Sequence, residues 1–175
     1  ATGPELAALA LRPHLVWGPG DTNLVARLVE RARAGRLRLV GGGRSLVDTT
    51  YVDNAVDAHL LAAERLAPRA PCAGRAYFIA NGEPRSVGEV VNAILGAAGL
   101  PPERRSLPLR LALALGRACE LANAVVPFRG GPPMTRFIAR SLATAHWYDL
   151  GAARRDLGYT PRVSFEDGIG RLAAW

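Results

Sequence analysis

The sequence predicts an α/β fold, and three features of its 175 residues support this class. Short apolar runs such as 76–80 have the length and residue types of buried strands. Longer segments carry apolar residues at helical spacing, as at Leu24, Leu28 and Val29. Turn-forming and helix-capping residues separate the two kinds of segment. Because predicted strands and helices alternate, the α/β class is favoured over all-helical or all-strand folds.

The predicted elements follow one another without a long polar linker. Strands are expected at 6–16, 37–40, 46–52, 76–80 and 144–148. Helices are expected at 23–34, 55–66, 86–98, 107–126, 135–142, 149–157 and from 164 onward. We therefore expect residues 1–175 to form a single body rather than two domains.

Local signals justify these elements in chain order. The turn Trp17-Gly-Pro-Gly-Asp21 ends the first apolar run, and Asp21 or Thr22 can cap the helix that follows. Gly35 suits the end of that helix, since glycine adopts the left-handed conformation needed there. Gly41-Gly-Gly43 predicts a flexible turn before the next strand.

The second half carries similar signals. The β-branched residues in 46–52 favour a strand, and Asp53 is expected to cap the next helix. Asn81-Gly82 predicts a turn. Ser86-Val-Gly-Glu89 has the form of a capping box, and Ser164 with Asp167 predicts the start of the last helix.

The charge pattern limits the classes of partner. All 22 basic residues are arginines, and the net charge is +7. The arginines are scattered and form no dense run with interleaved aromatics, so a solvated basic surface is favoured over a nucleic-acid groove. Cys72 and Cys119 provide no disulfide framework. A reducing, cytoplasmic compartment is therefore the simplest expectation.

The sequence offers no metal or nucleophile motif. The three histidines, His14, His59 and His146, are far apart and lack zinc-ligand spacing. No Gly-x-Ser-x-Gly nucleophile elbow, secretory signal or apolar run of membrane-spanning length is present. We expect no metal site.

Two features imitate the parts of a redox site. The loop with Gly18 and Gly20 has Asn23 where a dinucleotide-binding loop needs a third glycine, so a pyrophosphate site is disfavoured. Tyr51 is expected to be exposed at a strand end, but a phenol needs a nearby cation to act as a base at neutral pH. Four residues on is Ala55 rather than lysine, which favours a packing or substrate-wall role.

The long apolar segment 107–126 has two interpretations that the sequence leaves open. One is a helix buried in its own domain. The other is a helix that covers a hydrophobic substrate or contacts a membrane surface.

Four segments, taken in order, resemble the extended short-chain dehydrogenase/reductase family, also described as the NAD-dependent epimerase/dehydratase family. These segments are Leu11–Asp21, Leu46–Leu60, Ala76–Gly82 and Asp149–Pro161 with Ser164–Gly168. The residues of these segments are most similar to those of the 3β-hydroxysteroid dehydrogenase-like branch, and within it to 2-alkyl-3-oxoalkanoate reductases of olefin biosynthesis. The resemblance covers essentially the whole chain.

The resemblance implies the C-terminal half of an extended Rossmann-type reductase: the last sheet strands plus the substrate-binding subdomain. The N-terminal cofactor half and the Tyr-x-x-x-Lys pair are expected upstream of Ala1, so no catalytic residue is assigned here. The chain is thus expected to be truncated at both ends and inactive alone. Nicotinamide contacts are implied at Pro13, His14, Leu15 and Val16. Substrate contacts are implied at Trp17, Gly18, Asp21 and Tyr51.

The implied activity is NAD- or NADP-dependent oxidoreduction of a hydrophobic 3-oxo/3-hydroxy substrate, sterol-like or 2-alkyl-3-oxoalkanoate-like. A homodimer is implied for the full-length protein. Three alternatives stay open: a non-catalytic module that binds a lipid-like ligand or a partner, a UDP-sugar epimerase-type enzyme, and nucleic-acid binding through the arginines.

Overall fold

The computed structural model describes residues 6–128, 132 and 134–175. These residues form two compact units. The first unit comprises the described residues of Ala1–Arg27, Asp48–Pro84 and Trp147–Trp175. The second comprises those of Leu28–Val47 and Arg85–His146. The chain thus leaves the first unit twice and returns to it twice.

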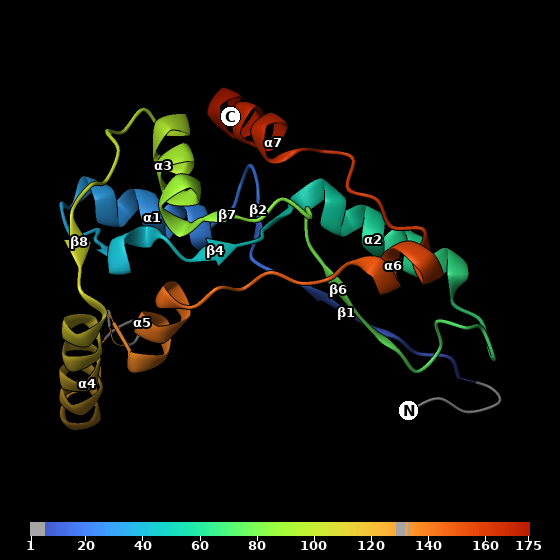
Figure 1. Ribbon diagram of the computed structural model, residues 1–175, viewed down its shortest axis with the longest axis horizontal. Coiled ribbons are helices and arrows are strands. Elements are labelled where there is room, and N and C mark those ends of the chain that lie inside the picture. The colour runs from blue at the N-terminus through green and yellow to red at the C-terminus, as the bar shows by residue number, and fades with distance from the viewer. Residues whose placement is uncertain (1–5, 129–131, 133) are drawn as a thin grey trace. The chain divides into compact units, whose positions relative to one another are not determined.

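The first unit is built on parallel strand pairs. Its elements are β1 (Ala10–Pro13), β2 (Val16–Trp17), β5 (Thr50–Tyr51), α2 (Val52–Arg65), β6 (Ala76–Ile79), α6 (Gly151–Leu157) and α7 (Phe165–Ala174). Strand β1 pairs with β6 in parallel, with Ala10 opposite Ala76, and β2 pairs with β5 in the same sense. Helices α2 and α6 contact each other beside the β1–β6 pair (Figure 1).

The core of the first unit lies where these two helices meet β6. Tyr77 and Ile79 point inward from alternate positions of β6 and are at most 1% exposed. The core cluster consists of Ala58, Ala62, Cys72, Tyr77, Ile79, Ala80, Leu150, Ala153, Leu157 and Tyr159. The Tyr159 hydroxyl donates to the Ala80 carbonyl oxygen at 2.9 Å. This hydrogen bond satisfies the only polar atom of the Tyr159 side chain inside the apolar cluster. Burial raises the pKa of the Tyr159 phenol.

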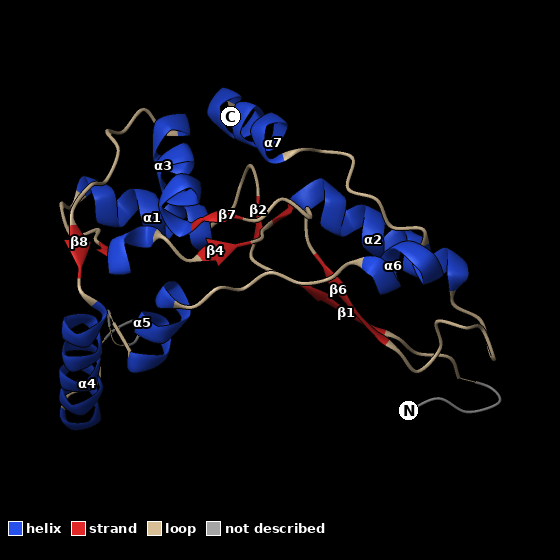
Figure 2. Ribbon diagram, in the orientation of Figure 1, coloured by secondary structure: helices blue, strands red, loops and turns tan. Residues whose placement is uncertain are grey.

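The second unit combines short strands with four helices. Its elements are α1 (Leu24–Arg33, whose first turn is counted in the first unit), β3 (Leu39–Val40), η1 (Gly41–Gly43), β4 (Leu46–Val47), β7 (Arg85–Ser86), α3 (Val87–Ala97), β8 (Ser106–Leu107), α4 (Leu109–Val125) and α5 (Arg136–Ala143). Strands β3 and β8 are parallel, whereas β4 and β7 are antiparallel. Within the described residues, every sheet has two strands, shown red in Figure 2.

The structure corrects several predicted element bounds. The expected strand 6–16 starts only at Ala10 and is divided into β1 and β2, because Leu15 has a φ of 45° that breaks the extended chain between them. Residues 46–52 form two short strands rather than one. The expected strand 144–148 is reduced to a single bridge between His146 and Val47. Asp53 is not the N-cap of α2, since Tyr51 holds that position and Asp53 lies in the first turn.

Other local predictions are confirmed. Ser86 and Glu89 form a complete capping box at α3, and the Ser164 side chain accepts from the Asp167 N–H at α7. Gly35 has a φ of 65°, as a glycine that ends a helix should. No helix in the described part of the chain is long and apolar enough to cross a membrane.

Candidate functional site

The four residues expected to meet nicotinamide form a bend between two parallel strand pairs. Pro13 is the last residue of β1, and the His14 N–H donates to the Ile79 carbonyl oxygen at 3.0 Å. The Leu15 carbonyl oxygen accepts from the Thr50 N–H at 3.2 Å. Val16 then begins β2. The bend is therefore fixed by backbone hydrogen bonds on both sides of Leu15.

The side chains of this bend differ in exposure. Leu15 and Val16 are 42% and 38% exposed, so they present an apolar surface to solvent. The His14 ring is half-buried, and its Nδ1 donates to the Asp48 carbonyl oxygen at 2.7 Å. The His14 and Tyr148 rings also pack in a T-shaped arrangement, with centroids 5.1 Å apart. The two contacts fix the plane of the imidazole beside the exposed apolar pair.

Two of the expected substrate residues are buried in the core. Trp17 is 1% and Tyr51 is 2% exposed, so the expectation that Tyr51 is exposed is wrong. The two rings pack edge to face at 5.4 Å, and Trp17 also packs on Phe165. A Cβ on Gly168 would lie 2.7 Å from the Tyr51 ring, so α7 approaches closely. Residues from the far end of the sequence thus cover Tyr51.

Gly18 and Asp21 have structural roles in the loop between β2 and α1. Gly18 is buried, and a Cβ there would lie 2.6 Å from the Val52 side chain, so only glycine fits. The Asp21 carboxylate accepts from the N–H groups of Asn23, Leu24 and Val25 at 2.7–3.2 Å. Because a bound phosphate would need these same donors, Asp21 gives a physical reason why this loop is not a pyrophosphate cradle.

Asn54 and Asn81 form a buried amide network that was not predicted from the sequence. Asn54 and Asn81 are 0% and 5% exposed, and the Asn54 amide donates to Asn81 Oδ1 at 2.8 Å. Asn81 Oδ1 also accepts from the Tyr51 N–H, while Asn54 Oδ1 accepts from the N–H groups of Arg162 and Val163. Both amides also donate to the Val163 carbonyl oxygen. The network fixes the β5–α2 junction, and its sequence signals were the dipeptides Asp53-Asn54 and Asn81-Gly82.

Asp48 is a second buried polar residue that sequence reasoning missed. It is 0% exposed, and its carboxylate accepts from the N–H groups of Gly82 and Glu83 at 2.8 and 3.3 Å. Burial raises the pKa of this carboxyl above its ordinary value, although hydrogen bonds from backbone N–H groups, including those of Gly82 and Glu83, oppose the shift. With its carbonyl oxygen bound to His14, Asp48 links the bend at residues 13–16 to the Asn81-Gly82 turn.

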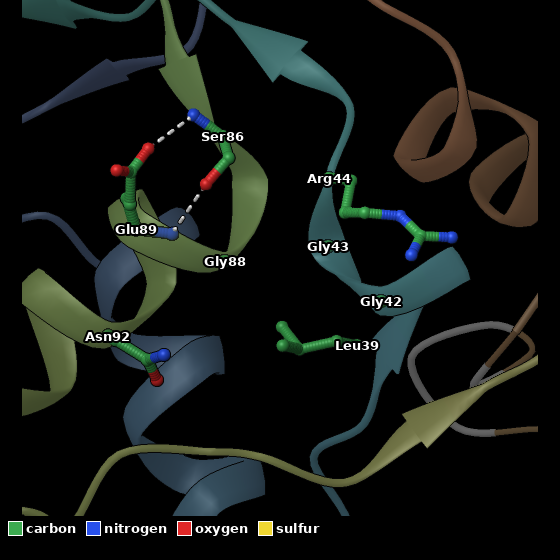
Figure 3. A pocket seen from close by; sticks show the side chains of 8 residues that line it. All are labelled: Leu39, Gly42, Gly43, Arg44, Ser86, Gly88, Glu89 and Asn92. Atoms are coloured by element: carbon green, nitrogen blue, oxygen red, sulfur yellow. Dashed lines mark hydrogen bonds between the residues drawn. The ribbon is translucent and has the colours of Figure 1, made fainter.

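The second unit contains an open pocket between η1 and the start of α3. Its lining residues are Leu39, Gly42, Gly43, Arg44, Ser86, Gly88, Glu89 and Asn92 (Figure 3). A Cβ on Gly43 would lie 3.0 Å from the Gly88 backbone, so the two segments touch through glycines. Figure 3 shows the Glu89 carboxylate held in the capping box with Ser86, while the Arg44 guanidinium extends away from α3. None of the predicted site residues lies in this pocket.

Metal ligation has no basis in the part of the chain that the structure describes. No group of three His, Cys, Asp or Glu residues there could hold a metal ion.

Comparison with solved structures bears on the fold. A crystal structure of gox2253 covers 95% of this chain with a TM-score of 0.64 and 21% identity. Another, of WbmF from Bordetella bronchiseptica in complex with NADH, covers 97% with a TM-score of 0.62 and 20% identity. This chain accounts for 48% and 45% of those two chains. The α/β fold of the extended dehydrogenase/reductase type is confirmed, and the chain represents about half of such a fold.

Comparison with curated proteins gives closer relatives. The 2-alkyl-3-oxoalkanoate reductase of Stenotrophomonas maltophilia is 55% identical over 99% of this chain and 53% of its own length. The protein of the same name from Shewanella oneidensis is 47% identical over 97% and 44%. Sterol-4-alpha-carboxylate 3-dehydrogenase, decarboxylating, of Mus musculus is 33% identical over 93% and 46%. The chain therefore spans about half the length of these relatives.

The match to a family profile settles the classification. Residues 1–109, well over half of the chain, match the profile of the 3-beta hydroxysteroid dehydrogenase/isomerase family. This match agrees with the order of the four resembling segments and with the relatives above. The chain belongs to the 3-beta hydroxysteroid dehydrogenase/isomerase family, within the extended short-chain dehydrogenases/reductases.

Proposed function

We propose that this chain is the substrate-binding portion of an NAD(P)-dependent oxidoreductase that acts on a hydrophobic 3-oxo or 3-hydroxy substrate. The observation that carries the proposal is the 55% identity, over nearly the whole chain, to a 2-alkyl-3-oxoalkanoate reductase. The weaker identity to a sterol dehydrogenase supports the same reaction class on a bulkier apolar substrate. A 2-alkyl-3-oxoalkanoate is therefore the favoured substrate and a sterol the second.

The bend at Leu15 and Val16 fits one side of a nicotinamide ring. Both side chains are apolar and exposed, and the positive φ of Leu15 turns the chain there. When bound, the nicotinamide would supply or accept a hydride at the carbonyl carbon of the substrate. Leu15 and Val16 would exclude water from one side of that ring, and His14 would hold the bend in place through Asp48.

The chain's own contribution would be orientation rather than proton transfer. It has no lysine, and Tyr51 is buried, so it supplies no exposed tyrosine–lysine pair of the family type. The buried network of Asn54 and Asn81 keeps the β5–α2 junction rigid, which would hold a substrate at a fixed angle. Isolated from a cofactor-binding half, the chain is expected to be inactive.

The test is a nicotinamide absorbance assay on the longest protein that the gene encodes and on this chain alone. We expect NADH or NADPH to be consumed only when a 2-alkyl-3-oxoalkanoate is added, and only by the longer protein. The absence of any such consumption with both 2-alkyl-3-oxoalkanoates and 3-oxosteroids would overturn the proposal.

A point substitution tests the position of the cofactor. Val16→Asp places a carboxylate beside the proposed nicotinamide surface, and we expect kcat/KM to fall by roughly tenfold or more through a raised KM for the cofactor. Leu46→Asp is the matched control, because Leu46 is 43% exposed and lies in the second unit. Equal losses in both variants would argue against a cofactor contact at Val16.

A further inference from the structure

Helix α4 packs on its neighbour through its small residues. Ala112 and Gly116 are its buried positions, and Ala112 packs with Val40 and Ala139. A Cβ on Gly116 would lie 2.7 Å from the Arg136 backbone nitrogen, so α5 begins directly against this glycine. The face of α4 that carries its small residues is therefore packed on α5, and α5 does not cover the large apolar side chains of α4.

Those large side chains form an exposed stripe. Leu111, Leu115, Leu121 and Val125 are 49%, 46%, 61% and 82% exposed. At about 3.6 residues per turn, Leu111, Leu121 and Val125 lie on the side of α4 opposite Gly116, with exposed alanines between them, and Leu115 lies at one margin of that side. A continuous exposed apolar stripe of this kind normally marks a binding surface. We call these four residues the α4 stripe.

The exposed charges of α4 beside the stripe are basic. Arg110 and Arg117 are exposed and fall on one margin of it. The one acidic residue in α4, Glu120, lies toward α5 and accepts from Arg136 Nε at 2.7 Å. The pKa of Glu120 is lowered by its hydrogen bonds from Arg136, so it stays ionised in that pair. Arg136 thus neutralises the one carboxylate that α4 itself carries.

We propose that the α4 stripe docks on an anionic phospholipid surface, with Leu111, Leu121 and Val125 in the acyl boundary and Arg110 and Arg117 on the headgroups. An interfacial helix needs an apolar face for the acyl boundary and basic residues for the headgroups, and α4 has both. A second copy of this chain would carry the same net charge of +7, whereas an anionic lipid surface has the sign opposite to Arg110 and Arg117. The charge balance favours lipid. The inference goes beyond the proposed redox function and does not depend on it.

Vesicle flotation in a density gradient tests the proposal, because bound protein rises while aggregated protein sinks. The probes are vesicles of phosphatidylcholine alone and vesicles that also contain phosphatidylserine. We expect this chain to float with the phosphatidylserine vesicles, and to float less as salt is raised, since salt screens the arginines. Equal flotation with neutral vesicles, or none with either kind, would overturn the proposal.

Matched variants locate the contact. Leu121→Gln should weaken vesicle binding by roughly tenfold, and Arg110→Gln with Arg117→Gln by about fivefold for each arginine. The controls are Leu60→Gln, at 57% exposure in the first unit, and the exposed Arg36→Gln, and both should bind like the parent chain. Loss of binding in the controls alone would place the contact elsewhere. A dimer that Leu121→Gln disrupts, without vesicle binding, would assign the stripe to a second copy and overturn the lipid proposal.

Discussion

At the scale of single residues, the buried side chain of Asn54 makes four hydrogen bonds. It accepts from two backbone N–H groups and donates to Asn81 and to the Val163 carbonyl oxygen. Asn54→Ala would leave these buried groups without partners, so we expect the free energy of unfolding to fall by about 2–4 kcal/mol. Urea denaturation followed by circular dichroism measures this loss. Asn23→Ala, at an exposed position, should stay within about 0.5 kcal/mol of the parent.

Glu103 gives a pH-dependent prediction at the same scale. Its carboxylate accepts hydrogen bonds from the Arg105 guanidinium at 2.7–3.3 Å, which lowers the pKa of Glu103 to about 2 from an ordinary 4.5. The pKa is lower in the folded state, so this contribution to stability is complete above pH 4.5 and is lost as pH falls toward 2. Glu103→Gln should therefore destabilise the chain most at neutral pH.

The measurement is the unfolding free energy of the parent and of Glu103→Gln at several pH values. We expect the gap between them to shrink as pH falls below 4.5, because the parent carboxyl then begins to be protonated. Glu64→Gln, at an exposed site in the first unit, is the control. If the difference in unfolding free energy between the parent and Glu103→Gln did not change with pH, the ion pair between Glu103 and Arg105 would not be the cause of the destabilisation.

At the scale of elements, two helix glycines make opposite predictions. Gly116 in α4 faces the start of α5, where an added Cβ would lie 2.7 Å from backbone atoms, whereas Gly96 in α3 has nothing within 4 Å. Gly116→Ala should destabilise the chain by about 1–3 kcal/mol, because the overpacked helices must separate. Gly96→Ala should stabilise it by about 0.5–1 kcal/mol through helix propensity alone. Thermal melts of the pair check both signs, and stabilisation by both would disprove the close approach of α4 and α5.

The same scale shows what the sequence could predict. The capping box at Ser86 and Glu89 and the helix-ending Gly35 depend on neighbouring residues, and both were predicted. The burial of Trp17 and Tyr51 depends on Phe165 and Gly168, which follow them by more than a hundred positions. No periodicity in the first 60 residues could reveal that cover. The Asn54 network could not be predicted for the same reason, since its partners at 162 and 163 are more than a hundred positions away in the sequence.

At the scale of the whole molecule, the β1–β6 pair of the first unit has one covered face and one bare face. The apolar run 76–80 predicts a buried strand, but along β6 only Tyr77 and Ile79 are buried, and Phe78 is 37% exposed. Phe78 stacks on Tyr148 at 4.1 Å, with Arg12 near its ring. In the described residues β1 and β6 pair only with each other, so each also has an unpaired edge. The chain's span of about half its relatives agrees with a missing cover.

This bare face predicts that the isolated chain self-associates. Exposed apolar sheet faces and open strand edges favour contact between copies, so we expect a mass that rises with concentration in size-exclusion chromatography with light scattering. Phe78→Thr should shift the distribution toward monomer, because it removes the largest exposed ring of β6. Phe137→Thr, at 77% exposure in the second unit, is the control and should leave the distribution unchanged. A monomer at every concentration would mean that the face is stable without a partner, and would weaken the case that this chain works as part of a larger reductase.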